Sequence, residues 1–174
     1  MTVDTTITLL PDARPLITLA YADALDLLLK PDWSIELVDM VLHEVTRNDT
    51  PTSERIAAWV RDQDMRIIET NIYRHYAQSK TTATPVRKAN PGELSIQEAM
   101  SGFGLAGERT GVFLFEDHKI ARTSFLLPDN CRKVSTRAFL LFLEQQGLIE
   151  SAANIERRAI QAGRHFSRIR FPPE

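Results

Sequence analysis

Residues 111–116, GVFLFE, are an almost unbroken apolar run bounded by Gly111 and Asp117. A strand with one face in water alternates apolar and polar side chains, whereas a run like this is typical of a parallel strand that is covered on both faces. It is the clearest strand in the sequence. It predicts an α/β fold, because helices must cover both faces of a sheet that contains such a strand.

The rest of the chain alternates in the way that such a fold requires. Further strands are expected at 6–10, 34–37, 65–69 and 131–134. Helices are expected at 15–29, 38–47, 51–63, from Pro91 through Phe103, at 135–146 and at 151–162, with a helical turn near 117–124. The alternation predicts a mostly parallel sheet of four to five strands in a single domain over 1–174. Residues 71–90 are polar, basic and threonine-rich, and are expected to be a long loop or a mobile insertion.

The sequence offers few ligands for a transition metal. It has one cysteine, Cys131, and four histidines without a closely spaced pair, so neither a zinc cluster nor a structural histidine site is expected. Carboxylates would have to hold a metal, which favours hard ions such as Mg²⁺ or Mn²⁺. There is no secretory signal and no apolar stretch long enough for a membrane span, so a cytoplasmic protein is expected.

Charge is unevenly distributed along the chain. The net charge of −2 argues against nucleic-acid binding over the whole surface. Residues 70–90 nevertheless contain Arg74, Lys80, Arg87 and Lys88 without an acid, and residues 157–170 contain five arginines without an acid. Such stretches either bind phosphates or are solvated surface.

Four acids are predicted to gather at one edge of the sheet. They follow predicted strands or lie in the helices beside them: Asp12, Glu44, Glu93 and Asp117. Ligands of open parallel sheets bind at the carboxyl ends of the strands. Each acid also has a second interpretation, with Asp12 and Asp117 as helix N-caps, Glu93 as a capping-box acid and Glu44 as a solvated helix residue.

A shared location for these carboxylates would have a chemical consequence. Converging carboxylates repel one another and raise each other's pKa. A divalent cation removes that repulsion, lowers the pKa of a bound water and polarises a phosphoryl oxygen. Because no histidine or cysteine is nearby, the predicted chemistry is phosphodiester hydrolysis by metal-activated water.

Several stretches resemble the PIN-domain family of metal-dependent ribonucleases, which supplies many toxins of bacterial toxin–antitoxin pairs. In chain order they are LLPDARPLITLAYADALDLL, LVDMVLHEV, NPGELSIQEA, VFLFEDHKIAR and VSTRAFLLFLEQQGLIESA. Together they cover most of residues 6–165. The resemblance implies a three-layer α/β/α fold and an Mg²⁺- or Mn²⁺-dependent endoribonuclease. It also implies RNA as substrate, an antitoxin protein as partner and a homodimer as assembly.

The resemblance also assigns residues. The catalytic metal ligands would be Asp12, Glu44, Glu93 and Asp117, with Glu98 and Glu116 as neighbouring candidates. Apart from the resemblance, Arg14 is a candidate to position the phosphate, as are Lys119 and Arg122, which follow Asp117 within about a turn.

Arg14 is a departure from the family, whose members usually carry Ser, Thr or Asn near the first acid. It has three interpretations: it points to solvent, it binds the scissile phosphate, or it pairs with Asp12 in place of the cation. The third would leave a catalytically silent PIN-like module that binds RNA or a protein partner. That module is the alternative to the nuclease.

Overall fold

The computed structural model describes residues 6–79, 91–116 and 127–165. Its centre is a five-stranded sheet in which all neighbouring strands pair in parallel, in the order β3-β2-β1-β4-β5. The strands are β1 (Thr6–Pro11), β2 (Ser34–Val38), β3 (Arg66–Ile68), β4 (Arg109–Phe115) and β5 (Cys131–Ser135). β4 is buried from Gly111 to Phe115, as its apolar run predicts. The predicted α/β class and parallel sheet are confirmed.

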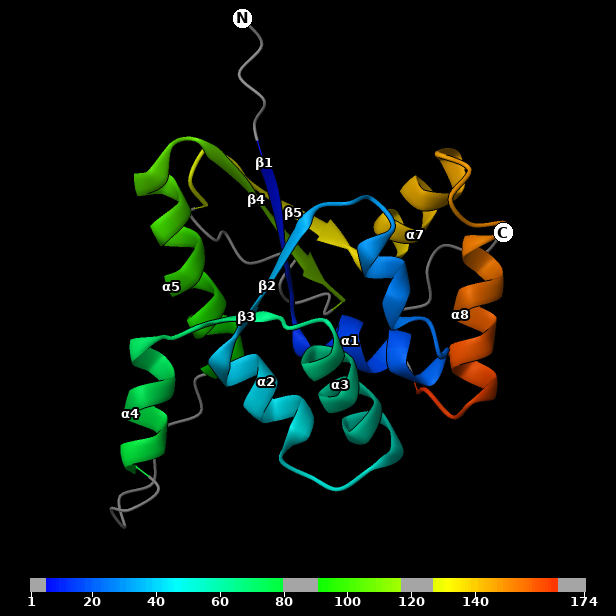
Figure 1. Ribbon diagram of the computed structural model, residues 1–174, viewed down its shortest axis with the longest axis horizontal. Helices are drawn as coiled ribbons and strands as arrows, with labels where there is room; N and C mark the ends of the chain where they lie inside the picture. Colours follow the sequence, from blue (N-terminus) through cyan, green and yellow to red (C-terminus); the bar gives the residue numbers. More distant parts are fainter. Residues whose placement is uncertain (1–5, 80–90, 117–126, 166–174) are drawn as a thin grey trace, which may run out of the picture.

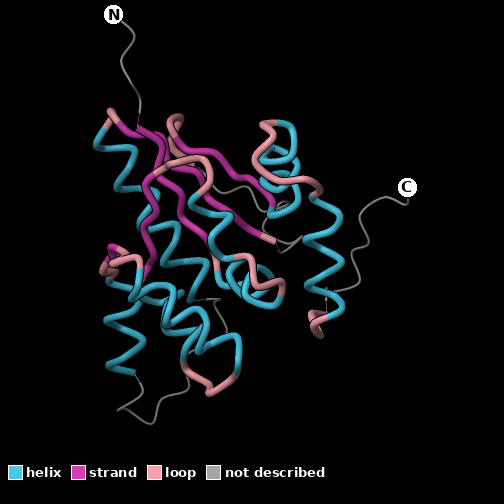
Figure 2. The backbone as a smooth tube through the Cα atoms, turned by 45° about the vertical axis from the view of Figure 1, so that its right-hand side comes forward, coloured by secondary structure: helices cyan, strands magenta, loops and turns pink. Residues whose placement is uncertain are grey.

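Helices cover both faces of this sheet (Figure 1, Figure 2). They are α1 (Ala13–Tyr21), the 3₁₀ helix η1 (Leu25–Leu29), α2 (Asp39–Thr46), α3 (Pro51–Asp62), α4 (Asn71–Ser79), α5 (Pro91–Ala106), α7 (Thr136–Gln145) and α8 (Ala152–Gln161). In Figure 1, α5 lies to the left of the sheet and α7 and α8 to its right. In the described parts of the chain, no helix has both the length and the apolarity that a membrane crossing needs.

α2 lies where the two helical layers meet. It follows β2 directly and contacts α1 and α3 of one layer and α4 and α5 of the other. One face of α2 is buried through Met40, Val41 and Val45. A polar residue beside that buried face is therefore held at the carboxyl edge of the sheet, between the layers.

The prediction of one helix over 15–29 is wrong, because α1 ends at Tyr21 and the separate helix η1 follows. Asp23 adopts a positive φ of 52°. The N–H of Ala24 donates to the carbonyl of Leu19 (2.8 Å) and that of Asp23 to Ala20 (3.1 Å), the bonds of a Schellman motif. Glycine is the usual residue at this position of the motif. Because Asp23 stands there instead, the end of α1 could not be recognised from the sequence.

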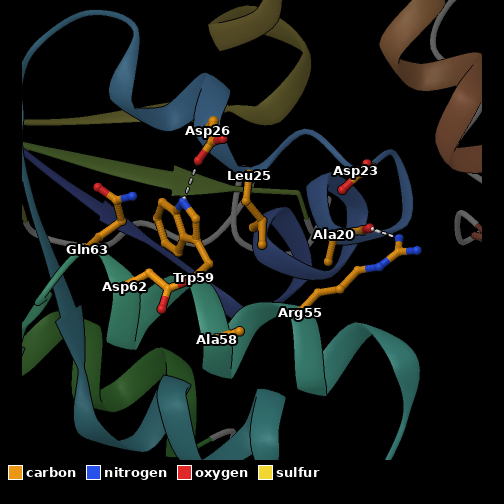
Figure 3. Close-up of a pocket in the computed structure, with 9 residues that line it drawn as sticks. All are labelled: Ala20, Asp23, Leu25, Asp26, Arg55, Ala58, Trp59, Asp62 and Gln63. Carbon is orange, nitrogen blue, oxygen red and sulfur yellow. Dashed lines mark hydrogen bonds between the residues drawn. The ribbon is translucent and has the colours of Figure 1, made fainter.

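Two side chains of α3 hold the junction between α1 and η1 in place (Figure 3). Arg55 donates from Nη1 to the carbonyl of Ala20 (2.8 Å), at the end of α1. Trp59 donates from Nε1 to Asp26 at the start of η1 (3.0 Å). A pocket lies between these elements, and Arg55 and Trp59, which line it, also hold the fold together.

The loop or insertion expected at 71–90 is also wrong for residues 71–79, which form α4. Glu98 of α5 caps this helix, accepting from the N–H groups of Asn71 (2.9 Å) and Ile72 (3.2 Å). The cap comes from an acid far along the chain, so the local composition did not reveal it. Residues 80–90 and the helical turn expected at 117–124 lie outside the described residues. The other predicted elements are confirmed with small shifts at their ends.

An ion pair crosses the sheet on the face that α5 covers. Arg109 at the start of β4 donates to Glu36 on β2 (2.8 Å) and to the hydroxyl of Thr8 on β1 (2.7 Å). Its guanidinium lies 4.8 Å from the ring centre of Phe103 on α5. The Glu36 side chain is only 8% exposed, so loss of Arg109 would leave a buried carboxylate without its main partner.

Arg109→Met is expected to lower the free energy of unfolding by about 3 kcal/mol, because it removes the closer cationic partner of the buried Glu36 and leaves only the exposed Arg66. Arg66→Met is the matched control, since Arg66 also contacts Glu36 (3.4 Å) but is 74% exposed. It should cost less than about 1 kcal/mol. Urea unfolding measures both variants, and equal losses would contradict a buried role for Arg109.

Candidate functional site

Asp12 lies at the carboxyl end of β1, the middle strand of the sheet. Its backbone N–H donates to the carbonyl of Leu114 on β4 (2.9 Å). Its Oδ1 accepts from the N–H of Ala13 (2.8 Å), so Asp12 is the N-cap of α1. The residue is 7% exposed. The cap interpretation is therefore confirmed, and the cap lies beside a second carboxylate.

That second carboxylate belongs to Glu44 of α2. Burial raises the pKa of Glu44 above its ordinary value of 4.5, and the negative charge of Asp12 raises it further. Arg47 and the N–H of Gly92 lower it. Glu44 is thus a partly desolvated acid that is influenced by the charge of another acid. This environment differs from that of a solvated helix residue, which is the second interpretation of Glu44. The charge of one predicted ligand, Asp12, therefore acts on a second, Glu44, although they belong to elements that are separated in the sequence.

The start of α5 holds the Glu44 carboxylate. Gly92 donates its backbone N–H to it. A Cβ placed on Gly92 would lie 2.6 and 2.8 Å from the two Glu44 oxygens, closer than real Cβ atoms come to other atoms. Ser95 donates to the Gly92 carbonyl (2.6 Å) and keeps this turn in place. A helix N-terminus favours a negative charge, so the approach is also electrostatically favourable.

Glu93 follows Gly92 in the first turn of α5 and is half-buried. It therefore lies one residue from the N–H group that holds Glu44. The expected capping partner, Asn90, lies outside the described residues, as do Asp117, Lys119 and Arg122. The roles predicted for these residues stay predictions.

Glu116 occupies the end of β4, and protein groups surround its carboxylate. Thr18 of α1 lies 2.9 and 2.8 Å from its two oxygens, with the hydroxyl as donor. Arg164 donates from Nε to the Thr18 hydroxyl (2.9 Å) and places Nη2 4.0 Å from Glu116. Burial raises the pKa of Glu116, and the Thr18 hydrogen bond and the charges of Arg164 and Arg14 lower it. Glu116 is thus an acid that already has cationic neighbours.

Arg14 is exposed, and its charge acts on Glu116. The sequence suggests an ion pair between Arg14 and Asp12, the acid nearest to it in the chain. In the structure the charge of Arg14 acts on Glu116, which directly follows β4. The sequence did not reveal this relation, because it depends on the pairing of β1 with β4.

Two further acids near the edge have structural partners. Glu98 caps α4, and this structural role accounts for the position of its carboxylate without a metal. Asp39, which the sequence analysis did not single out, follows β2 directly. It accepts from Met40 N–H (2.7 Å) and from the N–H and hydroxyl of Thr70 (both 2.7 Å). The apolar strand before Asp39 is the same signal that identified Asp12 and Asp117.

The acid pair fits a small, hard cation. Within 6–79, 91–116 and 127–165, no three His, Cys, Asp or Glu side chains form a group that could hold a metal ion. Asp12 and Glu44 supply two sets of carboxylate oxygens. Mg²⁺ keeps several waters and is usually bound by one or two carboxylates together with substrate phosphates. A pair of repelling, desolvated carboxylates suits that mode of binding.

No protein-family model matches this chain, and no curated protein matches it either. The class that the fold defines is an α/β protein with an all-parallel, five-stranded sheet. Any assignment of function has to come from the residues at the carboxyl edge, because a fold of this kind hosts many functions.

Glu44→Gln is expected to raise Tm at pH 7 in the absence of divalent ions. A carboxyl group whose pKa is higher in the folded chain than in the unfolded chain opposes folding when it is ionised. The gain should be fully present above the raised pKa of Glu44 and should vanish as the pH falls through 4.5, its ordinary value. Thermal melts over this pH range measure the effect.

Glu54→Gln is the control for this variant, because Glu54 is an exposed acid in the first turn of α3. It should give no gain in Tm at pH 7. A decrease in Tm for Glu44→Gln at pH 7 would contradict the desolvation of Glu44.

Proposed function

We propose that this protein is a divalent-metal-dependent endoribonuclease of PIN type. The observation that carries the proposal is Glu44 near the carboxyl edge of a parallel sheet, with its pKa raised by burial and by the charge of the buried Asp12. Carboxylates with this environment gain most from a cation. The resemblance of the sequence to PIN ribonucleases supports RNA as the substrate.

Each residue has a distinct task in this proposal. Asp12 and Glu44 bind the ion through carboxylate oxygens, and Glu93 and Asp117 would complete the set. Gly92 holds the Glu44 carboxylate with its N–H group. When bound, the ion lowers the pKa of a water and polarises a phosphoryl oxygen. In the hydrolysis that this would support, the water oxygen would bond to phosphorus as the bond to the leaving ribose oxygen breaks, and the proton lost by the water would pass to that leaving oxygen.

Positive groups would hold the phosphate during this step. Arg14 is exposed and close enough to the edge for its charge to act on Glu116. Lys119 and Arg122 are proposed for the same task from the sequence. The PIN resemblance further supports a toxin role, in which an antitoxin would mask the site by placing a basic side chain among the acids.

Wild-type protein is expected to cleave a fluorogenic RNA with Mn²⁺, and Asp12→Asn should reduce cleavage to background because it removes a charged ligand. Gly92→Ala should reduce cleavage about 10–100-fold, as changes to groups that orient a metal ligand do. Its Cβ would displace the end of the flexible Glu44 side chain, which costs the fold little.

Gly102→Ala is the matched control, since Gly102 is in the same helix and a Cβ there meets nothing within 4 Å. It should leave cleavage unchanged. Cleavage that persists in Asp12→Asn would indicate a contaminating nuclease and would remove the basis of the assignment.

Mn²⁺ should raise Tm of the wild type, because a ligand of the folded state stabilises it. At about ten times the dissociation constant the gain is about 1.4 kcal/mol, or a rise of about 3–6 °C for a chain of this size. Asp12→Asn should lose most of this rise. RNA binding by the wild type with neither cleavage nor an Mn²⁺-dependent shift would favour the catalytically silent module.

A further inference from the structure

A groove of about 670 Å³ lies between the end of β3 and α4. Its lining includes Asp39 and Thr70, which follow the carboxyl ends of β2 and β3. The groove therefore opens at the same edge of the sheet as the acid pair. Sites for small ligands commonly have volumes of about 300–1,000 Å³.

The wall of this groove is fixed before any ligand arrives. The Asp39 carboxylate is engaged by Met40 and Thr70, and the Thr70 hydroxyl also accepts from the N–H of Tyr73 (3.1 Å). Glu98 caps α4 from α5. α4 is held firmly in this way although it contributes no buried residue to the core. In Figure 1 it stands at the lower left, outside α5.

A row of aromatic rings connects the groove with the helix that carries Glu44. Tyr73 lines the groove. Its ring lies 6.5 Å from that of Tyr76, at an interplanar angle of 25°, and 5.6 Å from that of His43 on α2. His43 belongs to α2, the helix that carries Glu44, so the rings extend from α2 to the groove.

We propose that this groove binds an unpaired nucleobase of single-stranded RNA, stacked on Tyr73, with Arg74 binding an adjacent phosphate. The proposal rests on the proposed ribonuclease function and adds a place for the strand beside the scissile bond. Bases stack on aromatic side chains without regard to sequence, and arginine pairs with phosphate.

The lining combines an aromatic ring with a cation and an acceptor, which together suit the parts of a nucleotide. Ile67 and Ala77 are the aliphatic side chains among the described lining residues. Arg74 is exposed and available to an anion at the rim. Glu69, also in the lining, offers an acceptor for the amino group of a base.

The test measures binding of a short, fluorescently labelled single-stranded RNA by anisotropy in EDTA, where cleavage is absent. Tyr73→Ala should weaken binding about ten-fold or more, and Tyr73→Phe, which keeps the ring, should bind within about two-fold of the wild type. The same RNA in a duplex should bind more weakly, because its bases are already stacked.

Arg74→Gln provides a second variant on the surface, in case Tyr73→Ala disturbs α4. It should reduce the salt dependence of binding by about one phosphate contact, whereas Arg61→Gln, at an exposed arginine of α3, should not. Photo-crosslinking with iodouridine-containing RNA should label the peptide that contains Tyr73. Labels confined to other peptides would overturn the proposal.

The outcomes separate this proposal from the nuclease. Mn²⁺-dependent cleavage with an unchanged KM in folded Tyr73→Ala would overturn the groove and leave the nuclease intact. RNA binding that depends on Tyr73, without cleavage under any condition, would support the groove as an RNA site and overturn the nuclease. RNA binding by Tyr73→Ala equal to the wild type would also reject the groove as an RNA site and would leave a protein partner as its occupant.

Discussion

The parallel pairing of β1 with β4 is the interaction on which the arrangement of polar groups depends. The register joins Thr6 to Arg109 and continues to Pro11 and Leu114. The N–H of Asp12 then adds one more bond, to Leu114. Two segments about a hundred residues apart therefore end together. Asp12 and Glu116 lie at the same edge because these strands stop together, and Thr18 of α1 reaches Glu116 there. A shift of the strand register by one residue would turn the strand side chains to the other face.

The two acids at this edge have different electrostatic surroundings. Burial raises the pKa of both Glu44 and Glu116. The strongest opposing influence on Glu116 is the Thr18 hydroxyl, followed by Arg164 and Arg14, so protein groups compensate its charge. At Glu44 the largest charge effect comes from another acid, Asp12, and it exceeds the opposing effect of Arg47. A cation therefore has more to offer at Glu44, and this difference separates a structural acid from a candidate ligand.

The sequence predicted those features that depend on local patterns. The apolar run of β4 and the Asp12 cap between β1 and α1 are visible in a few consecutive residues, and they are confirmed. The α4 helix was missed because its cap, Glu98, comes from another helix. The surroundings of Glu116 were missed for a related reason, since Arg164 reaches Thr18 across 146 residues of sequence. Contacts of this kind follow from topology, which composition does not encode.

Gly92 shows how a residue with no side chain can shape a charged site. The sequence predicted a capping box at the start of α5, with Glu93 as its acid. In the structure the Glu44 oxygens occupy the space that a Cβ would take on Gly92. That approach lets a backbone N–H at a helix N-terminus hold the carboxylate, and it does so without adding a positive side chain. The N–H group orients the Glu44 carboxylate, and the opposing charge of Arg47 has a smaller effect than the charge of Asp12. An oriented carboxylate is what a metal ligand requires.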